Sequence, residues 1–172
     1  MAVIDGKTAF VGGINIGDEY AGFGESPEHW RDLGMRIDGP AGGELRKLFR
    51  GNWEDERGKV PSDWTKASPP IADEGDAEVL VVNGGPHHTR SFIRSAFRMA
   101  IAGASESVKI VNPYFVPGPR VVRSLLRAAA RGVRVQLILP AKNDVPLVRL
   151  VSRSYYTPLL KGGIEIFERE GT

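Results

Sequence analysis

The pattern of apolar and polar positions in the first third of the chain predicts a β-hairpin, further strands and a helix. Residues 2–4 and 8–11 are short apolar runs typical of strands, and the Asp5-Gly6 pair between them is a strong tight-turn signal. Residues 28–39 predict a pair of strands that is broken at Gly34. Across residues 40–56, apolar side chains recur at helical spacing with charged side chains between them.

The rest of the chain alternates between apolar strand-like runs and amphipathic helical stretches. The predicted strands cover residues 79–82, 108–112, 133–139 and 164–167. The predicted helices cover residues 92–101, 120–131 and 147–161, and Pro158 is expected to kink or divide the last of them. Strand–helix alternation of this kind is typical of parallel βαβ units. The continuous apolar strands predict an α/β fold in which helices cover both faces of the sheet.

A stretch without apolar periodicity separates these two regions. Residues 58–76 contain three prolines and four acidic residues, and they predict a loop or linker. We therefore expect two α/β parts, residues 1–57 and 77–172, joined by the linker at 58–76.

Composition narrows the class of protein. With 172 residues, 41% hydrophobic and 26% charged, the chain is typical of a globular protein that buries roughly 70% of its unfolded surface. The absence of cysteine excludes disulfides, cysteine-ligated zinc and thiol catalysis. No apolar run approaches the roughly 20 residues of a membrane span. Because Asp5 and Lys7 interrupt the first apolar run, we expect neither a signal peptide nor a transmembrane segment.

Charge is unevenly distributed, although the net charge is only +2. Residues 1–85 contain 9 Lys/Arg and 16 Asp/Glu, a net charge of −7, whereas residues 86–153 contain 12 and 2, a net charge of +10. Two arginine ridges at helical spacing lie in the basic region: Arg90, Arg94 and Arg98, then Arg120, Arg123 and Arg127. Such ridges are often solvated helix faces. Their functional interpretation is docking to an anionic partner, a phospholipid surface or nucleic acid.

Four residues of the predicted hairpin have a spacing that points to a known family. Asp5, six residues, the Gly12-Gly13 pair, one residue and Asn15 resemble the second half of the phospholipase D motif, His-x-Lys-x4-Asp-x6-Gly-Gly/Ser-x-Asn. The fuller run of residues 3–20 is similar to the bacterial cardiolipin synthase branch of that family.

Later segments resemble the same branch in order and spacing, from residue 1 to about residue 168. They are residues 29–41, Phe49, Trp53, 113–117, 129–133, 139–140, Asp144, 152–156 and 159–160. The resemblance implies a phospholipase D-like mixed or parallel sheet with helices on both faces, in two halves that each carry one motif. Residues 1–57 then correspond to the end of the first half, with a truncated motif at 1–20, and residues 77–172 to a second half lacking its motif.

The resemblance also implies a reaction. One motif histidine attacks a phosphodiester and forms a phosphohistidine, the other protonates the leaving alcohol, and no metal or cofactor is required. By resemblance, Asp5 orients the motif histidine, Asn15 donates to the phosphate, and Gly12 and Gly13 let the backbone approach it. Since Asp-Gly turns are common, a turn-forming role for Asp5 stays open. Tyr114, at a strand end, is a candidate for the wall of the substrate cleft or for packing.

The sequence contains no His-x-Lys pair. Counting back four residues from Asp5 gives Met1, so the first pair is expected just before the chain and the second shortly beyond its last residue. His29, His87 and His88 each lack a lysine two positions later. We therefore expect a fragment, inactive alone, of a cardiolipin synthase-like phosphatidyltransferase, which transfers a phosphatidyl group between two phosphatidylglycerol molecules.

The resemblance implies anionic phospholipid, in particular phosphatidylglycerol, as the partner, on the cytoplasmic side of the bacterial membrane, with nucleic acid not the first choice. A second interpretation is a non-catalytic α/β module that binds anionic lipid or nucleic acid through its arginine-rich helices. A third is a phosphodiesterase or nuclease of the same family. Since His87-His88 have no identifiable third ligand, no metal site is expected. Gly6-Lys7-Thr8 is not a P-loop, because a strand rather than a helix is predicted after it.

Overall fold

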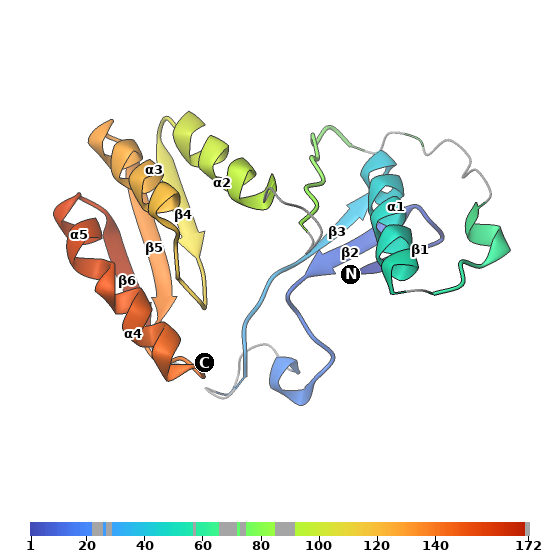
Figure 1. Ribbon diagram of the computed structural model, residues 1–172, viewed down its shortest axis with the longest axis horizontal. Coiled ribbons are helices and arrows are strands. Elements are labelled where there is room, and N and C mark those ends of the chain that lie inside the picture. The colour runs from blue at the N-terminus through green and yellow to red at the C-terminus, as the bar shows by residue number, and fades with distance from the viewer. Residues whose placement is uncertain are drawn as a thin grey trace. The chain divides into compact units, whose positions relative to one another are not determined.

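A computed structural model describes residues 1–21, 26, 29–56, 58–65, 72, 75–84 and 92–170. The chain divides into two compact units (Figure 1). The first comprises Met1–Gly22 and Arg31–Asn83, and the second comprises Gly84–Thr172 together with Phe23–Trp30. Each unit has its own three-stranded sheet.

The sheet of the first unit is antiparallel, with the strand order β1-β2-β3 (Figure 1). β1 (Ala2–Ile4) and β2 (Thr8–Gly12) form the predicted hairpin, in which Ile4 lies opposite Thr8. β3 (Gly34–Asp38) pairs with the other side of β2. The hairpin is therefore the structural centre of this unit.

Helix α1 (Pro40–Asp55) packs against this sheet, as the helical periodicity predicted. Gly42 permits a close approach, because a Cβ at this position would fall on the backbone carbonyl of Lys7. The buried apolar residues described in this unit are Ala9 on β2 and Leu45 on α1, with 0% and 5% of their surface exposed. The first unit thus has a small core between one helix and a hairpin.

An aromatic cluster holds the segment after α1 against that helix. The short 3-10 helix η2 (Ser62–Thr65), inside the stretch predicted as a loop, places Trp64 against Phe49 and Trp53. The ring centroid of Trp64 lies 5.7 Å from that of Phe49 and 5.5 Å from that of Trp53, edge to face in both cases. The Trp53 Nε1–H also donates to the Lys59 carbonyl at 3.3 Å. These aromatic side chains therefore pack together within the unit.

The sheet of the second unit is parallel, with the order β4-β5-β6, as the strand–helix alternation predicted. Its strands are β4 (Ser107–Val111), β5 (Arg134–Pro140) and β6 (Glu165–Arg169). Its helices are α2 (Phe92–Gly103), α3 (Pro119–Ala130), α4 (Pro146–Ser154) and α5 (Tyr156–Lys161). The last predicted helix is divided at Tyr155, because Pro158 has no N–H to donate to the carbonyl of Ser154.

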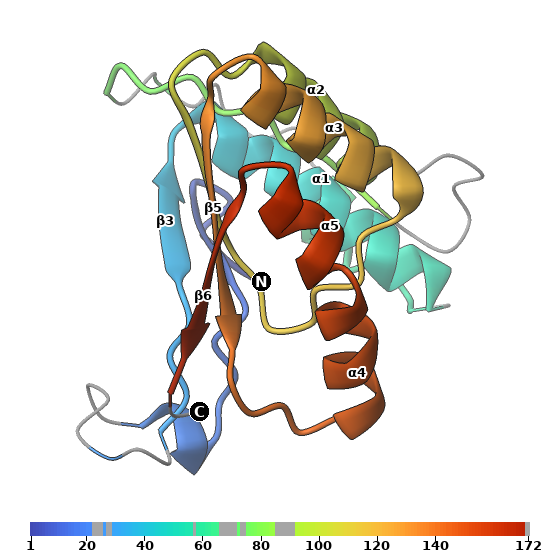
Figure 2. The same ribbon diagram turned by 90° about the vertical axis from the view of Figure 1, so that its left-hand side faces the viewer.

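Helices α3, α4 and α5 lie on one face of this sheet and enclose its core (Figure 2). On β5, Val135, Leu137 and Leu139 face this core and are at most 1% exposed, whereas Arg134 and Ile138 on alternate positions are exposed. The buried cluster consists of Ile101, Phe115, Leu125, Ala128, Val133, Val135, Leu137, Leu139, Leu159 and Ile164. The expected mixed α/β fold is confirmed, with one antiparallel and one parallel sheet. In the second unit the labelled helices lie on one face of the sheet (Figure 2), whereas helices on both faces were expected.

Two strand predictions were wrong. Residues 79–82 form no strand, and Val79 and Leu80 are 49% and 83% exposed. An apolar run becomes a strand only where a neighbouring backbone pairs with it, and the sheet of this unit contains β1, β2 and β3 alone. Residues 28–39 contain one strand among their described residues instead of a pair. Gly34 begins that strand, lying against Gly12, rather than interrupting it.

Candidate functional site

The tight turn of the hairpin places Asp5 at an exposed position. Asp5 and Gly6 have φ values of 51° and 68°, the positive values that mirror-image hairpin turns require. The Lys7 N–H donates to the Ile4 carbonyl at 3.1 Å and closes the turn. Aspartate tolerates a positive φ better than most residues do. The structure therefore places Asp5 in the turn, and its orientation of a histidine stays a prediction.

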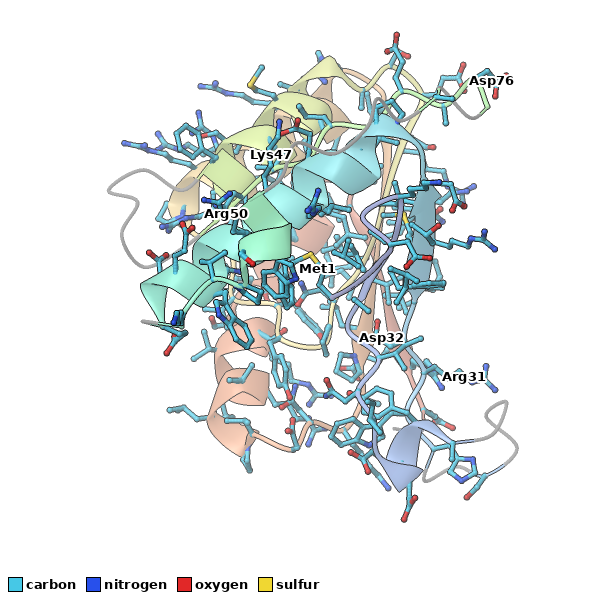
Figure 3. All side chains as sticks on the ribbon, turned by 90° about the vertical axis from the view of Figure 1, so that its right-hand side faces the viewer. Met1, Arg31, Asp32, Lys47, Arg50 and Asp76 are labelled. Atoms are coloured by element: carbon cyan, nitrogen blue, oxygen red, sulfur yellow. The ribbon has the colours of Figure 1, made fainter. Side chains whose placement is uncertain are left out.

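Gly12 and Gly13, at the other end of β2, lie where a side chain would collide with the neighbouring segment. A Cβ on Gly12 would lie 2.5 Å from the carbonyl oxygen of Leu33 and 2.8 Å from the Cα of Gly34. A Cβ on Gly13 would fall on the carboxylate of Asp32, which is labelled in Figure 3. The glycine pair thus has a packing reason of its own, and close approach to a phosphate stays a separate prediction.

Asn15 lies at the same end of the hairpin as the glycine pair, and its side chain is exposed. Its Nδ2 donates to the hydroxyl of Tyr20 at 3.2 Å, in the short 3-10 helix η1 (Asp18–Tyr20). Asp5 lies at the opposite end of β2, and the strand between them rises about 3.3 Å per residue, so the two ends are roughly 17 Å apart. The structure groups Asn15 with the glycine pair and separates Asp5 from both.

Tyr20 and Asp32 are two polar neighbours of this site that sequence analysis missed. Tyr20 follows Asn15 within one short polar run, which is a signal that could have suggested it. Asp32 reaches the glycine pair only because β3 pairs with β2, and its Oδ1 accepts the Leu33 N–H at 2.6 Å. No local pattern links Asp32 to the hairpin.

An open groove of about 640 Å³ runs beside α1 in the first unit. It is lined by Pro40, Ala41, Glu44, Lys47, Leu48, Val79, Leu80, Val81 and Asn83. Lys47, on α1, is labelled in Figure 3. None of the hairpin residues with the motif spacing lines this groove, so it is separate from the candidate phosphate site.

Tyr114 lies at the carboxyl edge of the parallel sheet, where α/β proteins commonly bind ligands. It follows β4, and its hydroxyl lies 3.0 Å and 2.9 Å from the two carboxylate oxygens of Asp144, which follows β5. Beside them, the Asn143 Nδ2 donates to the Pro113 carbonyl at 2.7 Å. Tyr114 is 47% exposed. The structure therefore gives Tyr114 a polar partner at an accessible edge, and its lining of a substrate cleft stays a prediction.

The arginine ridges keep an exposed face. Arg94 on α2 and Arg120, Arg123 and Arg127 on α3 are exposed. Arg98 is half-buried, and Arg90 lies outside the described residues together with His87 and His88. No helix within the described ranges combines the length and the apolar character needed to span a bilayer.

Arg131, directly after α3, has a structural role. Its guanidinium donates to the carbonyls of Ile101, Ala102 and Ala104 at 3.4, 3.0 and 3.2 Å. Carbonyls at the carboxyl end of a helix lack partners within it and carry the negative end of its dipole. Arg131 therefore ties α3 to the end of α2.

Two carboxylates with lowered pKa lie on the sheets. A hydrogen bond of 2.6 Å from the Thr8 hydroxyl is the main cause that lowers the pKa of Asp38 in the first unit. Hydrogen bonds from Arg134 and Gln136, both 2.8 Å, lower the pKa of Glu165 in the second. Both carboxylates link neighbouring strands, and we assign them a structural role.

Comparison with known proteins shows what this chain is similar to. Residues 97–172 match the family model described as cardiolipin synthase, PLD-like domain. The resemblance to the phospholipase D superfamily, in its cardiolipin synthase branch, is therefore confirmed. No solved structure gives a significant match.

Named relatives match along nearly the whole chain. The cardiolipin synthase of Geobacillus thermodenitrificans is 38% identical over 171 residues, which are 99% of this chain and 34% of that protein. The probable cardiolipin synthase YwiE of Bacillus subtilis is 36% identical over 167 residues, which are 97% of this chain and 33% of that protein. The chain thus spans about a third of the length of the curated relatives it matches.

Proposed function

We propose that this chain supplies part of the phosphoryl-binding site and the second-half scaffold of a phospholipase D-type phosphatidyltransferase that makes cardiolipin. The reaction transfers the phosphatidyl group of one phosphatidylglycerol to another and releases glycerol. The observation that carries the proposal is the hairpin end, which groups Gly12, Gly13 and Asn15 at the motif spacing. Similarity to named cardiolipin synthases over 99% of the chain supports it.

The hairpin register supports a location for the reactive histidine. Because Ala2 lies opposite Phe10, the amino end of β1 lies beside the end of β2 that carries the glycine pair. A His-x-Lys pair placed directly before Met1 would extend β1 along this end, near Asn15. Asn15 then donates to a phosphoryl oxygen, and a fixed donor of this kind stabilises the charge that grows there. Asp5 contributes from the turn by fixing the register of the two strands.

The chain alone is expected to be inactive. Without a His-x-Lys pair it lacks both the nucleophile and the acid of the proposed reaction. Purified residues 1–172, incubated with phosphatidylglycerol in mixed micelles, should form no cardiolipin above the protein-free blank. Turnover in this assay would contradict the proposed assignment of the nucleophile.

A chimera tests the proposal with activity as the readout. This chain replaces the matching segment of the Geobacillus thermodenitrificans cardiolipin synthase, and the chimera should form cardiolipin from phosphatidylglycerol. Loss of the amide donor in Asn15→Ala should then lower kcat about 100-fold. Asn52→Ala, an exposed asparagine on α1, is the matched control and should change nothing. A folded chimera without activity, or equal activity in both variants, would count against the proposal.

We also propose that the exposed arginines of α3 bring the chain to anionic lipid on the cytoplasmic side of the bacterial membrane. Each basic residue near such a surface contributes about 1 kcal/mol, and salt screens the attraction. The chain should sediment with phosphatidylglycerol vesicles at low salt and be released at high salt. A triple variant with Arg120, Arg123 and Arg127 changed to Gln should bind more weakly. Vesicle binding together with a folded but inactive chimera would favour the non-catalytic module instead.

A further inference from the structure

Helix α2 carries an apolar stripe that the described part of its unit leaves exposed. With about 3.6 residues per turn, Ile93, Phe97 and Ala100 share one side of this helix. Ile93 and Phe97 are 40% and 57% exposed, and Ala100 is exposed as well. The residue of α2 that faces the core is Ile101, which is 4% exposed. The stripe is therefore additional to the face through which α2 packs.

The packed side of α2 is firmly attached to the unit. α2 packs along α3 (Figure 1, Figure 2), and Ile101 belongs to the same buried cluster as Leu125 and Ala128 of α3. Arg131 donates to the carbonyls of Ile101 and Ala102 at 3.4 and 3.0 Å. The stripe is thus presented by a helix that is already held in place, which lowers the ordering cost of binding a partner.

The charge of this region indicates which kind of partner fits the stripe. Residues 92–131 contain seven Lys/Arg and one acid, Glu106, which gives a net charge of +6. The neighbouring helix α3 exposes Arg120, Arg123 and Arg127. An anionic lipid surface meets both features, because its headgroups attract the cations and its acyl chains accept the apolar side chains. A nucleic acid would match the arginines through its phosphates but would leave the stripe in water.

The length of α2 determines how it can meet a bilayer. Its 12 residues make a helix of about 18 Å, which is shorter than the roughly 30 Å of the hydrocarbon core. The side opposite the stripe carries Ser95, which is exposed. A short helix with apolar residues on one side and a polar residue on the other is suited to lie in the plane of the membrane interface.

We propose that α2 is an interfacial helix that inserts Ile93, Phe97 and Ala100 among the acyl chains of an anionic phospholipid bilayer. The proposal extends the proposed docking of the α3 arginines and rests on it for the choice of anionic lipid. The arginines attract the headgroups, and salt screens this attraction. The stripe adds a contribution that salt does not screen, because it comes from the burial of apolar surface.

The depth of single spin labels tests the insertion directly. The chain contains no cysteine, so an introduced cysteine is the only labelling site. Ala100→Cys places a nitroxide on the stripe, and Ser95→Cys places one on the opposite side of the same helix as the matched control. On phosphatidylglycerol vesicles, the label at position 100 should become accessible to oxygen and protected from a water-soluble nickel complex. The label at position 95 should stay accessible to nickel.

Substitution of the stripe should weaken membrane binding without any change of charge. Ile93→Gln combined with Phe97→Gln should lower the partition coefficient of the chain on phosphatidylglycerol vesicles by about tenfold or more. The loss should persist at high salt, where the arginines contribute least. Leu147→Gln combined with Leu150→Gln on α4 is the matched control, because these leucines are 70% and 69% exposed. It should leave partitioning unchanged.

Several results would overturn the insertion. They are equal depths of the two labels on the bound chain, and equal partition coefficients of the stripe variant and the unaltered chain. Protection of the label at position 100 without vesicles would also overturn it, because the stripe would then be a contact between copies of the chain. If the double variant of the stripe does not fold, the label depths decide.

The outcome is separable from the proposed function. Salt-reversible vesicle binding with both labels in water would retain the docking of the α3 arginines and reject the insertion. Insertion of the stripe together with a folded but inactive chimera would retain the interfacial helix and reject the transferase. An active chimera whose chain binds vesicles without inserting the stripe would do the reverse.

Discussion

Each unit of this molecule packs helix against one three-stranded sheet, but the two units bury very different amounts of apolar surface. In the first, α1 covers an antiparallel sheet, and Ala9 and Leu45 are the buried apolar residues described. In the second, helices cover one face of a parallel sheet, and ten apolar residues form one buried cluster. Because folding free energy is a small difference between large terms, a small core leaves a narrow margin. The second unit should therefore be the more stable.

The comparison also separates two ways of specifying a fold. The first unit depends on backbone geometry, with positive φ at Asp5 and close approaches at Gly12, Gly13 and Gly42. The second depends on interlocking side chains around β5. We therefore expect the first unit to be most sensitive to methyl groups added where backbones approach closely. We expect the second to be most sensitive to cavities left by truncated side chains.

Truncating one core leucine in each unit should give the largest difference. Leu125→Ala removes a fully buried side chain from a dense cluster and should cost about 3–5 kcal/mol of unfolding free energy. Leu45→Ala should cost about 2 kcal/mol, because half-exposed neighbours can close around the vacancy. Urea unfolding followed by circular dichroism measures both. Equal losses would show that the first unit has a tighter core than its buried residues indicate.

Two glycines of α1 test the role of backbone contacts in the first unit. Gly42→Ala places a methyl group on the Lys7 carbonyl and should destabilise the protein by about 1–3 kcal/mol. Gly51→Ala in the same helix meets nothing within 4 Å and should stabilise it by roughly 0.5–1 kcal/mol. Thermal unfolding midpoints should move in opposite directions. If both midpoints moved in the same direction, the close contact between α1 and the hairpin would not determine the stability of this unit.

The link between α2 and α3 is a polar contribution to the second unit. Arg131→Ala leaves the carbonyls of Ile101, Ala102 and Ala104 without their donor and should cost about 1–2 kcal/mol. Arg127→Ala, exposed on α3, should change stability little. Hydrogen exchange at the end of α2 should increase in the first variant only. If both variants had the same stability and the same hydrogen exchange, Arg131 would be a solvated arginine like Arg127.

Acid pH should give the smallest difference, through one carboxylate in each unit. The folded-state pKa values of Asp38 and Glu165 are lowered, mainly by hydrogen bonds from Thr8 and Arg134 respectively. Their contribution is complete above the unfolded pKa of about 4 and is lost as pH falls through the lowered folded value.

Glu165→Gln should therefore flatten the decline of the unfolding midpoint below about pH 5, while Glu106→Gln should not. Asp38→Asn should do the same for the first unit. A midpoint profile unchanged by both substitutions would remove these carboxylates from the acid response.

Much of the second unit could be predicted from the sequence, because its signals are local. Gly132 ends α3 with φ of 89°, and the buried positions of β5 alternate with Arg134 and Gln136. The strand predicted at 79–82 failed for the opposite reason. An apolar run indicates that its side chains favour burial. Whether it forms a strand depends on a second segment, elsewhere in the chain, whose backbone can pair with it.

The candidate sites also differ in whether a local sequence pattern can predict them. The spacing of Asp5, Gly12, Gly13 and Asn15 could be recognised because it lies within one hairpin, and its extended length already implies that Asp5 and Asn15 are far apart. The contact between Tyr114 and Asp144 could not be predicted. It joins residues 30 positions apart and depends on two loops that meet only after β4 and β5 pair in parallel.

Four of the six residues between Asp5 and Gly12, Thr8 to Val11, lie in β2, so the length of this interval decides which side chains face the core. Since neighbouring side chains in a strand point to opposite faces, one inserted residue would invert the sidedness of everything that follows. An insertion before Ala9 would turn its side chain out of the core. Two inserted residues would return each side chain to its original face of the strand. They would also shift Gly12 and Gly13 along the strand, away from Asp32. The number of residues between Asp5 and Gly12 is therefore fixed by the pairing of β2 with β3, and an insertion there would require a matching insertion in β3.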